Sequence, residues 1–286
     1  MEFLASKMPT PTMFGWFHLV AWAIVIGLCI LLILTRKSDS EKRSRIVLLT
    51  FSITAIVLEV YKQVLFAYNN NWQYEWYAFP FQFCSTPLYV ALIAGLVKEG
   101  KFRDALMSFL GTFGLFAGLA VMVFPGDVFM KYIGINIQTM VVHGGMVVVG
   151  IYCIISKRSK PTIKNFFTGV LVFVCLAAIA DIMNIIVYHS GVLHGATFNM
   201  FYISPYFKCT LLVLKEFYFL PYPVFLLLYV AGFTLAGFLM FLPGYVVEKI
   251  LTHKANKLET NYDTKNNTSV AETKNDDTKS TDKATK

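Results

Sequence analysis

A cysteine and a histidine in two different apolar stretches are the residues of this sequence best suited to covalent chemistry. Cys84 lies in the segment FPFQFCSTPLY, between Pro80 and Pro87. Pro80 suits the first turn of a helix, whereas Pro87 removes a backbone donor and predicts a kink. Free N–H groups and the positive end of a helix dipole favour a thiolate, so this position predicts a reactive thiol.

His143 is the partner that such a thiol needs. An imidazole lowers the pKa of a nearby thiol or removes its proton. Gly144 and Gly145 follow it and allow another helix to approach closely. A buried cysteine or histidine alone is more often inert. The hypothesis of a Cys–His pair therefore depends on the depth that the two side chains are expected to share in a membrane.

Other polar side chains are expected at that same depth, although ionisable groups inside a bilayer are costly. Glu59, Lys62 and Gln63 share one helix face, and Asp181 and Asn184 share another. We predict a polar cavity near the outer surface. Hydrogen-bonded packing between helices is the alternative for the amides, and mutual neutralisation is the alternative for Glu59 and Lys62. The remaining cavity candidates are His18, Gln82 and Asn199, the last either capping the cavity or anchoring the interface.

The elements that must position these residues are apolar helices. The chain has 286 residues, of which 56% are hydrophobic and 15% charged, and its mean hydropathy is +0.59. A soluble domain averages about 25% charged residues, so the composition indicates a polytopic membrane protein of the all-α class. Seven stretches are each about long enough to cross a bilayer. They are Phe14–Leu34, Ile46–Ala67, Phe79–Val97, Ala105–Phe124, Ile135–Ser156, Asn165–Tyr188 and Tyr218–Leu242.

The loops between these stretches alternate in charge. Loops 36–45, 98–104 and 157–164 together carry twelve basic and four acidic residues. The four segments on the other side, 1–13, 68–78, 125–134 and 189–217, together carry four basic and four acidic residues. The positive-inside rule then predicts an extracellular N-terminus (1–13), a seven-helix domain (14–250) and a cytoplasmic C-terminal tail (251–286). The polar composition of that tail predicts disorder. The expected location is the plasma membrane, and no nucleic-acid partner is expected because the basic residues serve topology.

The motifs resemble a known group of membrane proteins. The sequence resembles the YwaF-type bacterial integral membrane proteins and, more distantly, the animal seven-helix acyltransferase that uses a cysteine and a histidine. The resemblance spans residues 14 to about 242. It is carried by Pro80, Gln82, Cys84, Gln138, His143, His18, Glu59, Asn199, Phe201 and Tyr202. Bacterial members more often have Leu-His-Leu-Cys where this chain has Phe-Gln-Phe-Cys.

This resemblance implies a lipid acyltransferase or acyl hydrolase that needs no cofactor. Cys84 would attack an ester of a membrane phospholipid, His143 would be its base, and a lysophospholipid or water would accept the acyl group. Gln82 or the N–H groups of the Ser85–Thr86 turn would bind the oxyanion.

Two other functions compete with this one. A transporter or small-molecule binding protein would use Glu59, Lys62 and Asp181 in its cavity. A membrane zinc hydrolase would draw its ligands from the same carboxylates together with His18 and His143, although no local metal motif supports it.

Overall fold

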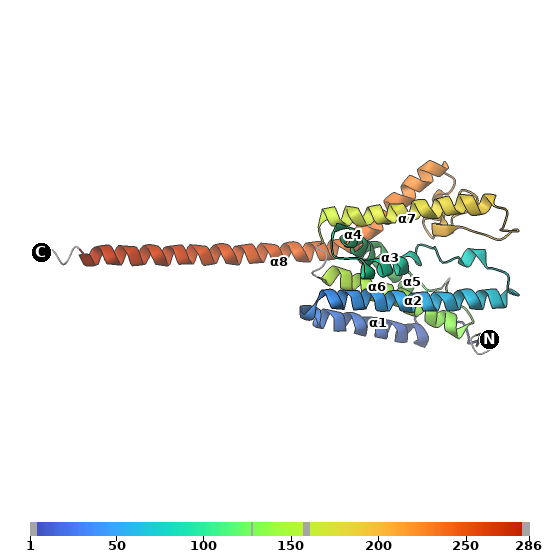
Figure 1. Cartoon of the computed structure of the whole chain (residues 1–286), viewed down its shortest axis with the longest axis horizontal. Helices are drawn as coiled ribbons and strands as arrows, with labels where there is room; N and C mark the ends of the chain where they lie inside the picture. The colour runs from blue at the N-terminus through green and yellow to red at the C-terminus, as the bar shows by residue number, and fades with distance from the viewer. Residues whose placement is uncertain (1–4, 127, 157–160, 282–286) are drawn as a thin grey trace. The chain divides into compact units, whose positions relative to one another are not determined.

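The structure, a computed structural model, describes residues 5–126, 128–156 and 161–281. It divides into two units, Met1–Leu242 and Pro243–Lys286. The first unit is a bundle of helices, in which α1, α2 and α6 run side by side (Figure 1). The only β-type pairing among the described residues is a bridge between Lys7 and Tyr132, so the predicted all-α class is confirmed.

Six helices in the described part of the chain are long and apolar enough to cross a membrane, where the sequence predicts seven. The α4–α5 span and the α6 span form the centre of the bundle. In each of them 67% of the residues in the apolar stretch are buried, whereas the corresponding share in the other four spans is 11–28%. The spans are α1 (Trp16–Leu34), α2 (Glu41–Asn69), α4 (Lys101–Phe109) continuing through the π-helical turn η3 (Leu110–Gly114) into α5 (Leu115–Val123), α6 (Ile133–Ile155), α7 (Ile163–His189) and the start of α8 (Tyr222–Thr281). Short turns η1 (Arg36–Ser38), η2 (Trp76–Ala78), η4 (Met200–Tyr202) and η5 (Leu214–Phe217) lie in the connections.

The third predicted span, Phe79–Val97, is the one that differs. Its helix α3 covers only Thr86–Leu96, eleven residues, because Pro87 lies in its first turn. Pro87 therefore starts the helix and does not kink it, as a proline without an N–H is tolerated only at a helix start. Residues 79–85, with Cys84, form an irregular connection before the helix.

The predicted disorder of the C-terminal tail stays a prediction. Helix α8 continues to Thr281, whereas the composition of residues 251–286 predicts disorder. Lysine, glutamate and alanine favour a helix locally even where no apolar face is present to pack. Residues 282–286 of that predicted tail, and residues 1–4 of the predicted N-terminal segment, lie outside the described residues.

Candidate functional site

Helix α2 positions the segment that contains Cys84. The Ser52 hydroxyl donates to the carbonyl of Leu88 at 2.8 Å, and the Gln63 amide donates to the carbonyl of Ala78 at 2.7 Å. The chain from 78 to 88 therefore runs antiparallel to α2. Cys84 lies between these two contacts, at a depth between those of Ser52 and Gln63.

The same part of α2 positions the turn that contains His143. A Cβ on Gly145 would lie 2.7 Å from the ring of Phe51. A Cβ on Gly134 would likewise overlap the hydroxyl group of Tyr61. Helix α6 is thus antiparallel to α2 as well, and His143 lies between these two contacts. Because side chains tilt toward a helix N-terminus, the imidazole points toward the Gly134 end, which is the side where Cys84 lies.

Helix α5 touches both segments through glycines one turn apart. The Cβ of Pro87 lies 3.7 Å from the position of a Cβ on Gly114. A Cβ on Gly118 would lie 2.7 Å from the carbonyl oxygen of His143. The start of α3 and the His143 turn therefore both pack against this short stretch, from Gly114 to Gly118.

The two nitrogens of the His143 imidazole have different surroundings. Nδ1 lies 2.7 Å from the carbonyl oxygen of Thr139, one turn earlier in α6. Nε2 is buried and has no hydrogen-bond partner in the described part of the chain. A carbonyl only accepts, so Nδ1 carries the proton and Nε2 carries the lone pair. His143 is therefore held in the tautomer of a base whose lone pair is unused.

An ion pair on α2 lies within electrostatic reach of both groups. Lys62 Nζ lies 2.8 Å from Glu59 Oε1, and the Gln63 amide donates to the same carboxylate at 2.8 Å. The Lys62 ammonium interacts electrostatically with the Cys84 thiol and with the His143 imidazole. The mutual neutralisation considered for Glu59 and Lys62 is present, and the two charges of the pair act on the Cys84 thiol in opposite directions.

Cys84 itself is half-buried, and no hydrogen bond joins its thiol to His143 among the residues described. The N–H groups of Ser85 and Thr86 donate to the carbonyl of Gln82, at 2.8 and 3.1 Å. These expected oxyanion donors are therefore already used within the turn. The N–H of Cys84 donates to no carbonyl in the described residues and instead interacts with the sulfur of its own side chain.

Comparison with known proteins places this bundle in a family. The model of the TMEM164 family matches residues 13–242. The chain belongs to the TMEM164 family. The match covers every candidate residue above and ends where the first structural unit ends, at Leu242. No curated protein and no solved structure matches the chain significantly.

In this TMEM164 family protein, three of the predicted cavity amides bind backbone of the connection between α7 and α8. Asn184 donates to the carbonyl of Met200 and accepts from its N–H, at 3.0 and 2.7 Å. Gln82 donates to the carbonyl of Asn199 and accepts from the N–H of Phe201, both at 3.0 Å. The Asn199 side chain in turn accepts from the N–H of Ser204. These amides shape the connection, as the packing alternative predicts.

Two further candidates are also occupied. His18 is fully buried; its Nδ1 accepts from the N–H of Phe14 at 3.0 Å, and its Nε2 donates to the carbonyl of Met122 at 2.7 Å. Asp181 accepts from the hydroxyl of Tyr222. The described residues bring together no group of three histidine, cysteine, aspartate or glutamate side chains of the kind that a zinc hydrolase needs.

Thr139 and Gly118 are the residues in contact with His143 that sequence reasoning missed. The signal for Thr139 is its place four residues before His143, since its carbonyl fixes the imidazole. The signal for Gly118 is weaker, because a glycine in an apolar run has many possible roles. Only the close approach of its Cα to the His143 turn identifies it.

Proposed function

We propose that this protein is a membrane lipid acyltransferase or acyl hydrolase in which Cys84 is the nucleophile and His143 the base. The observation that carries the proposal is the free Nε2 of His143, which is buried, unpartnered and fixed in the basic tautomer. A buried polar atom without a partner costs about 1–3 kcal/mol. A cost of that size at a group that can accept a proton favours a role in proton transfer.

The first half-reaction forms a thioester. His143 Nε2 takes the proton of the Cys84 thiol, and the thiolate attacks the carbonyl carbon of a lipid ester. The tetrahedral intermediate collapses by breaking the bond between that carbon and the ester oxygen. The protonated imidazole returns its proton to this oxygen, so a lysolipid leaves and the acyl group stays on sulfur.

The second half-reaction reverses these roles. Nε2 takes the proton of an acceptor hydroxyl, either that of a lysophospholipid or that of water. The resulting oxygen nucleophile attacks the thioester carbonyl, the carbon–sulfur bond breaks, and the sulfur leaves as a thiolate that regains the proton from the imidazole. No cofactor is required, because every proton and electron pair stays with the two side chains and the substrates.

The surroundings supply the charge stabilisation that these steps need. The Lys62 ammonium favours the thiolate and the oxyanion over their neutral forms by Coulomb attraction in a low-dielectric site. The N–H of Cys84, which donates to no backbone carbonyl in the described residues and lies beside the attacking sulfur, is our candidate oxyanion donor.

The position in the bundle favours a lipid substrate. Both residues are contributed by a bundle whose helices are long enough to span a bilayer, at a depth below the end of α2 that carries Asn69. We propose seven crossings, with α3 and the connection before it completing the third, an outer N-terminus and an inner C-terminus in the plasma membrane. The scissile ester of a phospholipid lies just below the headgroups, whereas His143 lies near the middle of α6 (Ile133–Ile155), so the proposal requires the ester to enter the bundle below the headgroup level.

The test is to trap the acyl-enzyme. Wild type in nanodiscs is incubated with alkyne-tagged phosphatidylcholine, and protein-bound alkyne that hydroxylamine releases is measured. We expect no label on Cys84→Ala, labelling slowed 10²–10⁴-fold in His143→Ala, and normal labelling of Cys29→Ala, which removes another half-buried thiol. Equal labelling of all three variants would discard the mechanism. A transporter would keep its activity in Cys84→Ala.

A further inference from the structure

A long apolar groove runs between α1 and α2, with α6 as its floor. Its volume is about 980 Å³, and its lining extends along α1 from Trp16 to Leu31. Helix α1 packs on α6 and makes little direct contact with α2. Only two residues of α1, His18 and Val25, are buried.

Glycines in the floor make the groove deep. A Cβ on Gly144 would lie 2.5 Å from Val25 of α1, and one on Gly145 would lie 2.7 Å from Phe51 of α2. Both walls therefore rest directly on the backbone of α6, and the space between them stays open. In a membrane the medium beside this space is hydrocarbon, so its occupant must be apolar along the groove's length.

The groove is longer than the hydrocarbon of one leaflet is thick. The fifteen residues of rise from Trp16 to Leu31 correspond to about 22 Å. The hydrocarbon of one leaflet is about 15 Å thick, so a single acyl chain lies within the groove with its headgroup at one end.

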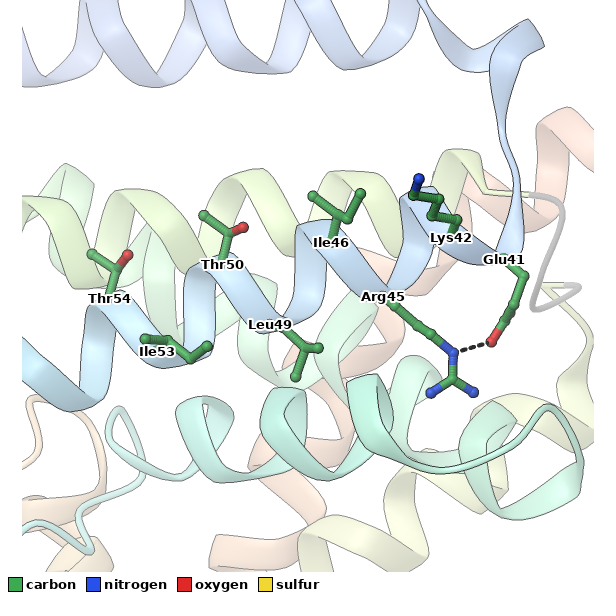
Figure 2. Close-up of a pocket in the computed structure, with 8 residues that line it drawn as sticks. All are labelled: Glu41, Lys42, Arg45, Ile46, Leu49, Thr50, Ile53 and Thr54. Carbon is green, nitrogen blue, oxygen red and sulfur yellow. Dashed lines mark hydrogen bonds and ion pairs between the residues drawn. The ribbon is translucent and has the colours of Figure 1, made fainter.

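The basic end of the groove indicates which headgroup. Figure 2 shows Lys42, Ile46, Thr50 and Thr54 on the side of α2 that faces α1, and the last three line the groove. The Lys42 ammonium is exposed and makes no hydrogen bond or ion pair within the described residues.

Neighbouring cations strengthen this end of the groove. The turn η1, which joins α1 to α2, adds the exposed side chains of Arg36 and Lys37. Arg43 donates to the carbonyl of Thr35 and holds the two helices together there. The end is therefore positively charged and closed by the chain itself.

We propose that this groove binds one acyl chain of an anionic phospholipid whose phosphate pairs with Lys42. The site is separate from the proposed Cys–His site, because its headgroup end is the opposite end of α2 from Glu59 and Lys62. It does not depend on the acyl-transfer proposal. The bound lipid fills the gap that the packing of α1 leaves and makes α1 part of the bundle.

The experiment measures lipid that stays bound after extraction. Protein is reconstituted in nanodiscs of equal phosphatidylglycerol and phosphatidylcholine, extracted in mild detergent, and analysed by native mass spectrometry. We expect wild type to retain phosphatidylglycerol in preference to phosphatidylcholine. Lys42→Ala should lower that preference about fivefold, the effect of one lysine at an anionic headgroup. Lys98→Ala removes an exposed lysine from another loop and should leave the preference unchanged.

A second pair of variants tests the groove itself. Thr50→Trp places a large ring between α1 and α2 and should lower retention of both lipids. Ile53→Trp places the same ring on the other side of α2 (Figure 2), outside the groove, and should retain lipid as wild type does. The proposal is overturned if Lys42→Ala and Lys98→Ala show the same lipid preference, or if Thr50→Trp retains as much lipid as Ile53→Trp.

Discussion

Two buried histidines of this protein should respond to the same substitution with opposite changes in stability. His18 and His143 are each under a tenth exposed, and both lie in helices of the bundle. Leucine has a similar volume, so His→Leu at either site removes the ring nitrogens without opening a large cavity. The difference between the variants therefore reports the hydrogen bonding of the ring.

The contacts set the expected size of each effect. At His18 the substitution leaves the N–H of Phe14 without its hydrogen-bond acceptor and removes one donor to the carbonyl of Met122. Trp22 still donates to that carbonyl, at 2.9 Å, so the carbonyl keeps a donor. Phe14 is exposed, so its N–H is not a buried orphan; the two lost hydrogen bonds cost about 0.5–1.5 kcal/mol each, and we expect His18→Leu to lower the free energy of unfolding by about 2 kcal/mol.

At His143 the balance is reversed. The substitution removes the unpartnered Nε2 and with it a penalty of about 1–3 kcal/mol. The lost bond to the carbonyl of Thr139 costs about 1 kcal/mol and orphans nothing, since that carbonyl also belongs to the helical hydrogen-bond ladder. We expect His143→Leu to be as stable as wild type or up to about 2 kcal/mol more stable, and to have no acyl-enzyme activity.

The measurement is reversible unfolding of the three proteins in one detergent, for instance by steric trapping. Loss of activity without loss of stability in His143→Leu, beside loss of stability in His18→Leu, is the expected pattern. Equal destabilisation of both variants would show that Nε2 of His143 has a partner in the folded protein, and the reasoning from its free lone pair would fail.

Two further substitutions test the surroundings of the site and the opposite end of α2. Gly118→Ala places a Cβ 2.7 Å from the carbonyl oxygen of His143, which should cost about 1–3 kcal/mol of stability and slow acyl-enzyme formation about 10²-fold by moving the base. Gly27→Ala meets nothing within 4 Å and should leave both quantities unchanged; thermal unfolding and the labelling rate of the two variants compare them. Glu41→Gln weakens the 2.6 Å contact with Arg103, which keeps its contacts with Ser44 and Glu99; because Glu41 is 34% exposed, the free energy of unfolding should fall by only about 1–3 kcal/mol in the same assay. A loss below 1 kcal/mol would show that the ion pair is solvated.

Hydropathy and charge predict most of the fold because a bilayer permits few alternatives. A long apolar run must be a helix, so spans such as α6 and α7 follow from the sequence within a few residues. The third predicted span contains a shorter helix than expected, because Pro87 is compatible with both a kink and a helix start and here begins α3. The choice depends on contacts of the flanking residues Ala78 and Leu88 with α2, which no local pattern contains.

The candidate site was predictable only in part, and for a similar reason. The spacing of Asn184, three residues after Asp181, places both on one helix face but does not distinguish a cavity from a neighbouring backbone. In the structure the backbone of Met200 takes both hydrogen bonds of Asn184. His18 and His143 look alike as single histidines in apolar runs, and only the partners of their ring nitrogens distinguish them.

That difference between the histidines also suggests how this bundle reconciles stability with chemistry. A histidine with both nitrogens bonded, such as His18, stabilises the fold but must break a bond before it takes a proton. His143 has a free lone pair, which costs stability in the resting protein and is available as soon as a thiol or hydroxyl approaches. The ring cannot turn away from this position, because Thr139 holds Nδ1 and the close contact at Gly118 holds the backbone. The packing of α2 and α5 around this turn therefore offsets the unfavourable burial of a base that the proposed reaction needs.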